Sequence, residues 1–191
     1  QMPSTISTIS RSKQPQDLKE YYEVRSYFGT TVWIHCFYDA KADIAKAAKA
    51  CWQKADKIQA CMNVYAEPEE GNLSWLNKVG YQGVHVQEDI FKILKHSLEY
   101  SRLTKGAYDV TIFPLVQLWK NAAQEGRLPD KDLLGKVKDK VGYQHIILQE
   151  PDLGFCMKKG MMVDLGSPAS GYFCDEVASI LDANNIRYFM V

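Results

Sequence analysis

The pattern of apolar and polar residues changes its period along the chain, and each change marks a predicted element. In residues 21–27 and 31–38, β-branched and aromatic residues are dense, which predicts two strands joined near Gly29. From residue 40 to 65, apolar residues instead recur every third or fourth position, with Lys and Asp between them. This spacing predicts the longest helix of the chain, with one face in the core.

Further helices and strands follow the same two patterns. Helical spacing begins again at Pro114 and recurs elsewhere, over residues 73–79, 88–104, 130–141 and 172–183. Strand composition is found in residues 143–149, 155–157, 161–164 and 187–191. Together these elements predict an α+β fold in which helices cover one side of a mixed or antiparallel sheet.

Length and composition divide the chain into two parts. Residues 1–20 are rich in Ser, Thr, Gln and Pro and lack hydrophobic periodicity, which predicts a flexible N-terminal segment. It is interpreted either as a tether that follows a removed membrane anchor or as a cloning remnant. Residues 21–191 are enough for one domain with its own core.

Charge and cysteine usage argue against several classes of function. The 23 Lys and Arg residues balance 23 Asp and Glu residues, so no basic field points to nucleic acid. No apolar run approaches the roughly 20 residues that span a bilayer. The five cysteines form an odd set without a Cys-x-x-Cys pair, which argues against a zinc site or a thioredoxin-like centre. They are predicted to be buried free thiols.

The segment from Gly106 to Trp119 has the clearest signs of a ligand site. Gly106 follows a predicted helix, and Pro114 suits the first turn of the next one. Between them, Asp109 is flanked by Tyr108 and other apolar residues, and an enclosed carboxylate needs a partner. A charged group in a tight connection between two helices is therefore a candidate ligand contact.

This segment also resembles the ApbE family of FAD:protein FMN transferases, in which a Gly-Ala-aromatic-Asp segment leads into Pro-Leu-Val-x-Leu-Trp. Companion matches occur in the family's order: Phe28-Gly29-Thr30, Met62-Asn63-Val64-Tyr65, Leu73-Ser74-Trp75-Leu76-Asn77 and Asp164-Leu165-Gly166-Ser167-Pro168-Ala169-Ser170-Gly171-Tyr172. The resemblance covers nearly all of residues 21–191 and implies an ApbE-like, T-fold-like flavin-binding domain. The family's C-terminal portion has no counterpart, so a fold that is incomplete at that end is expected.

The resemblance also implies a set of site residues. Tyr65 would contact the isoalloxazine ring, Asp109 and Asp164 would hold flavin or ribityl hydroxyls, and Ser167 would offer oxygen to Mg²⁺. Two alternatives stay open from the residues alone: Tyr65 as the last core residue of its helix, and Gly29 as a simple hairpin turn. The complete set of predicted flavin contacts is Phe28, Tyr65, Ala107, Tyr108, Asp109, Asp164 and Ser170, with Ser167 for the metal.

The expected chemistry follows from the family pattern and from departures in one loop. Where the family typically reads Asp-Leu-Gly-Gly-Ile-Ala-Lys-Gly-Tyr, this chain has Ser167, Pro168 and Ser170, and a serine cannot replace a long charged side chain. The first hypothesis is an Mg²⁺-dependent enzyme that transfers FMN from FAD to a Thr or Ser of an acceptor protein. The alternative is a non-catalytic or truncated module that only holds flavin. We expect these 191 residues alone not to transfer FMN.

Location and assembly are expectations of the same kind. The resemblance implies export, often with a lipid anchor, and hence the periplasm or cell envelope, whereas unpaired cysteines also suit the reducing cytoplasm. A last strand that ends at Val191 would leave a sheet edge open. A second copy that covers this edge is therefore a further expectation.

Overall fold

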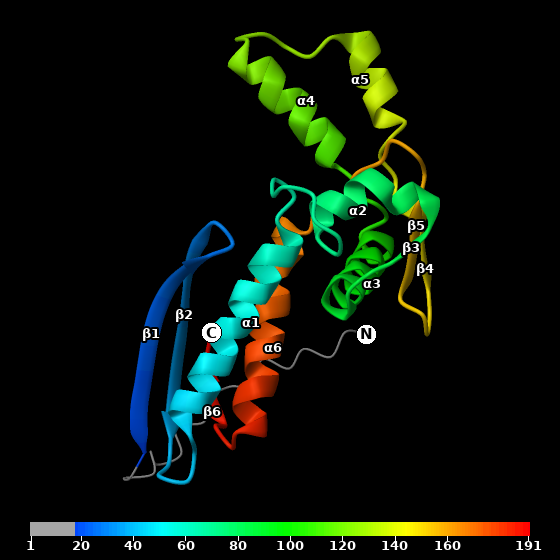
Figure 1. Ribbon diagram of the computed structural model, residues 1–191. Coiled ribbons are helices and arrows are strands. Elements are labelled where there is room, and N and C mark those ends of the chain that lie inside the picture. Colours follow the sequence, from blue (N-terminus) through cyan, green and yellow to red (C-terminus); the bar gives the residue numbers. More distant parts are fainter. Residues whose placement is uncertain (1–17) are drawn as a thin grey trace.

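The structure of the protein is a computed structural model that describes residues 18–191 (Figure 1). Helices and strands follow one another throughout this range. In chain order they are β1 (Lys19–Tyr27), β2 (Thr30–Tyr38), α1 (Ile44–Met62), α2 (Leu73–Val79), the 3₁₀ helix η1 (Gly80–Gln82), β3 (Val84–His85), α3 (Glu88–Leu103), α4 (Phe113–Gln124), α5 (Lys131–Lys138), the 3₁₀ helix η2 (Tyr143–His145), β4 (Ile146–Gln149), β5 (Gly154–Met157), α6 (Gly166–Ala183) and β6 (Tyr188–Met190).

The strands form two three-stranded antiparallel sheets, with the orders β1-β2-β6 and β3-β5-β4. In the first sheet, β1 and β2 pair from Lys19 with Tyr38 to Tyr27 with Thr30. The α+β class with antiparallel strands is therefore confirmed. The strands divide between two sheets, because β4 and β5 pair with each other and with β3 instead of extending the hairpin.

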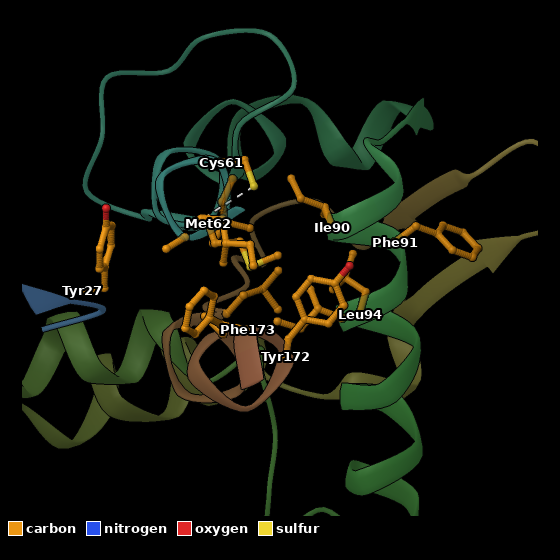
Figure 2. Packing of buried hydrophobic residues seen from close by; sticks show 14 of the residues in the cluster. Tyr27, Cys61, Met62, Ile90, Phe91, Leu94, Tyr172 and Phe173 are labelled. Atoms are coloured by element: carbon orange, nitrogen blue, oxygen red, sulfur yellow. Dashed lines mark hydrogen bonds between the residues drawn. The ribbon is translucent and has the colours of Figure 1, made fainter. Parts of the chain in front are cut away.

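The main core lies where α1, α3 and α6 pack together and against the β1-β2 hairpin. Figure 1 shows α1 and α6 side by side along the hairpin. Figure 2 shows Tyr172 and Phe173 of α6, Leu94 of α3 and Met62 of α1 gathered in this core. One stripe of α1 is buried, as its spacing predicts: Ala47, Ala48, Cys51, Trp52, Ala55, Ile58, Cys61 and Met62.

Several predicted boundaries are corrected by the structure. The first helix begins at Ile44, where the carboxylate of Asp43 caps it, and ends at Met62, so Tyr65 lies beyond its end. Lys19 and Glu20 were expected in the flexible segment but belong to β1, while residues 1–17 lie outside the described range. The predicted strand from residue 143 begins only at Ile146, after η2.

The region around Asp164 departs most from the sequence prediction. Residues 161–164 form no strand, and α6 begins at Gly166 instead of Tyr172. Pro168 was interpreted as part of a loop, but it lies in the first turn of α6, where a missing N–H breaks no helical hydrogen bond. Ser167 and Ser170 are consequently helical residues.

The cysteines are free thiols, as predicted. Cys36, Cys51 and Cys61 are buried, and Cys156 and Cys174 are half-buried. Burial raises the pKa of the Cys51 thiol to about 12 and that of Cys61 to about 11, so both are protonated at neutral pH. Across residues 18–191, no helix has the length and apolar character needed to cross a membrane.

Candidate functional site

Asp109 joins two segments that are distant in sequence. Its Oδ1 accepts hydrogen bonds from the backbone N of Thr111 at 2.8 Å and from the Thr111 hydroxyl at 2.6 Å. Its Oδ2 accepts from the backbone N of Tyr143 at 3.0 Å, and Thr111 Oγ1 accepts from the backbone N of Gly142 at 2.8 Å. The carboxylate therefore has the partners that the sequence required, and they belong to the protein itself.

The residues just before Asp109 form a tight exit from α3. Gly106 has a φ of +83°, a conformation that a side chain disfavours, and its N bonds back to the carbonyl of Ser101 at 2.8 Å. Ala107 is exposed, and Tyr108 is half-buried with its ring 6.5 Å from that of Tyr100. The Tyr108 hydroxyl is buried without a hydrogen-bond partner among residues 18–191, which leaves a donor for a ligand or a water.

The Asp164 loop lies directly beside the Asp109 loop. The backbone N of Asp164 donates to the carbonyl of Val110 at 2.8 Å. Asp164 Oδ1 accepts from the backbone N of Gly166 at 2.8 Å and so satisfies the first N–H of α6. In the first two turns of α6, Ser167 is exposed and Ser170 is half-buried. Two segments with candidate residues are thus held together by a backbone contact.

Asn77 fixes the approach to Asp164, and sequence reasoning gave it no role. Its side-chain amide donates to the carbonyl of Val163 at 2.9 Å and accepts from the backbone N of Val163 at 2.7 Å. The Asn77 amide thus pairs with both backbone groups of Val163, as a neighbouring strand would, although residues 161–164 belong to no sheet. The only signal was its place in the Leu73–Asn77 match.

Tyr65 reaches the same region from the loop after α1. Its side chain is 64% exposed, and its ring makes an edge contact with Phe113 at 5.5 Å. Lys120 Nζ lies 4.9 Å from the ring centre and donates to the Tyr65 hydroxyl at 2.6 Å. The alternative interpretation, a last core residue of the helix, is therefore wrong. Tyr65 is an exposed aromatic at the start of α4.

Phe28 lies farther from this group. It has a φ of +55°, and its backbone N donates to Gln59 Oε1 at 3.0 Å. Its ring lies 5.6 Å from Phe173 of α6. An open hollow of about 400 Å³ borders the hairpin turn, lined by Ser26, Tyr27, Gly29, Thr30, Thr31 and Gln59. The structure thus brings Tyr65, Asp109 and Asp164 together around the start of α4, whereas Phe28 contacts Gln59 of α1 and Phe173 of α6.

Comparison with known proteins assigns this geometry to a family. The model of the ApbE family matches residues 28–191. The chain belongs to the ApbE family. A curated FAD:protein FMN transferase of Haemophilus influenzae is 27% identical over 139 residues, which are 70% of this chain and 40% of that protein. One from Treponema pallidum is 24% identical over 182 residues, 91% of this chain and 50% of that protein.

Solved ApbE structures share the fold. A flavin transferase ApbE from Vibrio cholerae matches with a TM-score of 0.78 and 22% identity, over 91% of this chain and 56% of the other. The flavinyl transferase ApbE of Pseudomonas stutzeri, in its apo form, matches with a TM-score of 0.81 and 17% identity, over 93% and 57%. This chain therefore spans about half the length of its relatives.

The ApbE segment from Asp164 to Tyr172 is anchored at its far end by a buried carboxylate. Asp89 of α3 is 3% exposed, and it accepts from the Tyr172 hydroxyl at 2.7 Å and from Lys54 Nζ at 2.6 Å. Lys57 Nζ lies 2.7 Å from its other oxygen, and Lys54 also pairs with Glu176 at 2.8 Å. This cluster ties α1, α3 and α6 together.

Opposing effects set the pKa values in this cluster. Burial would raise the pKa of Asp89, but hydrogen bonds from Lys54, Lys57 and Tyr172 outweigh it and hold this pKa well below its usual range. Burial, together with the Asp89 carboxylate, raises the pKa of the Tyr172 hydroxyl far above its ordinary value. At neutral pH the carboxylate is therefore charged and the tyrosine is protonated.

The ApbE residues described here do not by themselves fit a magnesium centre. Within residues 18–191, no three His, Cys, Asp or Glu side chains are grouped closely enough to hold a metal ion. Asp164 and Ser167 are the candidate oxygen ligands at the start of α6, and Mg²⁺ needs near-octahedral coordination that two such groups do not impose. The role of Ser167 as a metal ligand stays a prediction.

Proposed function

We propose that this chain is the flavin-binding part of an FAD:protein FMN transferase. The observation that best supports it is the 2.8 Å hydrogen bond from Asp164 N to Val110 O, because it joins two candidate segments of the site. The Tyr65 ring contacts Phe113, the first residue of α4, which follows the Asp109 loop. Three segments far apart in sequence thus surround one point, as a ligand site on loops requires.

Two aromatic residues and one carboxylate are the direct flavin contacts in this proposal. Tyr65 would pack on the ring system, for which its exposed ring is suitably placed. Phe28, which contacts α6, would reach the flavin only from the side of that helix. Asp164 is half-buried, and its Oδ1 accepts from Gly166 N, so its second oxygen would accept from a ribityl hydroxyl. Lys120, which donates a hydrogen bond to the Tyr65 hydroxyl, would move aside or contact the isoalloxazine.

Asp109 acts indirectly. Both of its oxygens already accept protein hydrogen bonds, from Thr111 and Tyr143. Its contribution is therefore to shape the loop that presents Ala107 and Tyr108 to the ligand. Asp109→Ala removes charge-assisted hydrogen bonds worth about 1.5–3 kcal/mol each at most, so thermal stability and FAD affinity should fall together. FAD titration and thermal melts of the variant measure both.

The start of α6 is the proposed contact for the FAD phosphates. A helix N-terminus offers free N–H groups and positive partial charge, but here Gly166 N is already bonded to Asp164 and Pro168 has no N–H. Ser167 and the hydroxyl of Ser170 are the remaining donors. Few donors imply weak nucleotide affinity.

The proposed transfer would join an acceptor Thr or Ser oxygen to the FMN phosphorus and break the bond from that phosphorus to the bridging pyrophosphate oxygen. AMP leaves with that oxygen, and the hydroxyl proton passes to water. The Mg²⁺ that the family resemblance implies for this step would need further oxygen ligands beside Asp164 and Ser167. Because residues 18–191 lack a metal-binding cluster, we expect this chain alone to bind FAD without turnover. A non-catalytic flavin-binding module is therefore the second candidate. A cell-envelope location, a removed anchor and self-association belong to the proposal as well.

Incubation with FAD, Mg²⁺ and a Thr-containing acceptor peptide separates the two candidates. Flavin fluorescence measures FAD binding, and mass spectrometry detects FMN on the peptide and free AMP. Bound FAD without product favours the module. Covalent FMN would establish transfer by this chain alone. An absence of FAD binding would contradict both.

A gain of affinity tests the assignment of the phosphate contact. Ser170→Lys restores the long cationic side chain that the resemblance to ApbE places here, and it should lower the Kd for FAD about fivefold, or about 1 kcal/mol. Ser179→Lys, on the exposed far part of the same helix, adds the same charge elsewhere. If both variants bind FAD equally more tightly, the gain comes from general charge attraction and not from a phosphate contact at residue 170.

A further inference from the structure

A groove of about 290 Å³ separates α3 from β4, outside the proposed flavin site. Its floor is apolar, because Phe91, Leu98 and Ile146 line it and are themselves largely buried. In Figure 2, Phe91 points away from Ile90 and toward the strands of the second sheet. The groove therefore presents apolar surface at the edge of this sheet.

The charged residues of the groove leave one positive charge unbalanced. Lys95 Nζ and Glu150 Oε1 lie 2.6 Å apart and neutralise each other at one end. Arg102, which also lines the groove, is exposed and makes no ion pair within residues 18–191. A ligand with one negative group would therefore form an ion pair with Arg102.

The strand beside the groove has a free edge. β4 is the outer strand of the order β3-β5-β4. The backbone N of Ile146 donates to the carbonyl of Tyr143. In the described part of the chain, the backbone of residues 147–149 makes no hydrogen bond beyond its pairing with β5. Natural edge strands are usually protected by charges, proline or bulges, whereas β4 reads Ile-Ile-Leu-Gln. Its free N–H and C=O groups are therefore open to another strand.

The direction of the elements defines how a strand would lie. Lys95 meets Glu150 at the end of β4, and Arg102 lies two turns further along α3, about 10 Å away. Ile146, at the other end of β4, is roughly 13 Å from Glu150 along a strand. α3 and β4 thus run in opposite directions, and a strand antiparallel to β4 would end beside Arg102.

We propose that this groove binds the C-terminal segment of another polypeptide as an added antiparallel strand. The peptide backbone would pair with β4, alternate apolar side chains would enter the groove, and the terminal carboxylate would bind Arg102. Ile146, Leu148 and Glu150 all face the groove from alternate positions, which matches the period of a bound strand. This inference does not depend on flavin transfer.

Binding of labelled hexapeptides to the whole chain tests the proposal. The peptides carry valine or isoleucine at alternate positions counted from the C-terminus, and binding is followed by fluorescence anisotropy. We expect the free acid to bind and the C-terminal amide to bind about tenfold more weakly, since one charge-assisted contact is lost. Arg102→Gln should weaken binding of the free acid by the same factor and leave binding of the amide unchanged. Lys136→Gln removes an exposed cation of α5 and serves as the matched control.

Methylation of the peptide nitrogens separates strand addition from simple apolar binding. In an antiparallel ladder, alternate residues direct their N–H groups to the same neighbour. One of the two alternating methylation patterns should therefore abolish binding while the other preserves it. Equal effects of the two patterns, equal binding of acid and amide, or displacement by octanoate at the same affinity would each overturn the proposal. Circular dichroism of Arg102→Gln checks that the fold is retained, and added FAD should leave peptide binding unchanged.

Discussion

Helices α1 and α5 are both amphipathic, but they lie in opposite surroundings. α1 buries a full stripe between the hairpin and α6. α5 buries no residue, and apolar side chains beside and within it stay open, with Leu128 78% and Leu133 44% exposed. Figure 1 shows α4 and α5 projecting away from the remainder of the fold. An amphipathic pattern therefore predicts a helix without predicting how deeply it is buried.

The two regions should consequently differ in stability. The α1–α3–α6 region has a continuous apolar core and the Asp89 cluster. In α4, Phe113 and Ala122 are the buried residues. Regions with few buried contacts open locally at a lower free energy than the global unfolding transition. We expect the α4–α5 pair to open before the core does.

The largest expected difference comes from removing one apolar side chain in each region. Phe173 is 1% exposed and packs against Phe28 and Trp52. Phe173→Ala should lower the free energy of unfolding by about 3–5 kcal/mol, because it removes buried surface and leaves a cavity. Leu133→Ala should cost less than about 0.5 kcal/mol. Urea titration of both variants measures the contrast, and similar losses would contradict it.

The next effect comes from the buried charge of the core. Because the folded pKa of Asp89 lies below its unfolded value of about 3.9, its stabilising contribution is complete above that value and is lost as the pH falls through and below about 4. Asp89→Asn should lower the free energy of unfolding at pH 7 by about 1.5–3 kcal/mol. Its stability should also depend less on pH in the acid range.

Stability curves between pH 7 and pH 3 check this prediction. Glu150→Gln is the control, since it breaks the exposed pair with Lys95 and should change stability by less than about 1 kcal/mol. An unchanged acid slope in Asp89→Asn would show that other carboxylates govern acid unfolding. The Asp89 cluster would then not account for the difference in stability between the core and the α4–α5 pair.

Local patterns explain what the sequence could predict of the fold. The hairpin of β1 and β2, the buried stripe of α1 and the start of α4 beside Pro114 all follow from the period of apolar residues or from proline geometry. The start of α6 was missed because Pro168 indicates a loop and a first helical turn equally well. Only the surrounding packing separates these two meanings.

The candidate site was less predictable because its contacts are distant in sequence. Motif order selected Asp109 and Asp164, but not the contact between their loops or the 86-residue link from Asn77 to Val163. The lone carboxylate of Asp109 correctly indicated a need for partners. Its surroundings in sequence did not reveal that these are Thr111 and Tyr143. In the sequence, Asp89 looks like an ordinary acidic residue in the first turn of a helix. Its burial is explained only by the ion pair with Lys54, which lies on another helix.

The smallest expected effect compares one substitution in both regions. Gly135 of α5 and Gly171 of α6 are helical glycines with no atom within 4 Å of an added Cβ. Alanine at either position should stabilise its helix by about 1 kcal/mol. In α6, which unfolds with the core, Gly171→Ala should raise the global free energy of unfolding by that amount. In α5, Gly135→Ala should slow local hydrogen exchange about fivefold and leave the global transition unchanged. Hydrogen exchange and urea titration of the two variants measure both quantities, and a global gain in Gly135→Ala would show that the α4–α5 pair and the core unfold as one unit.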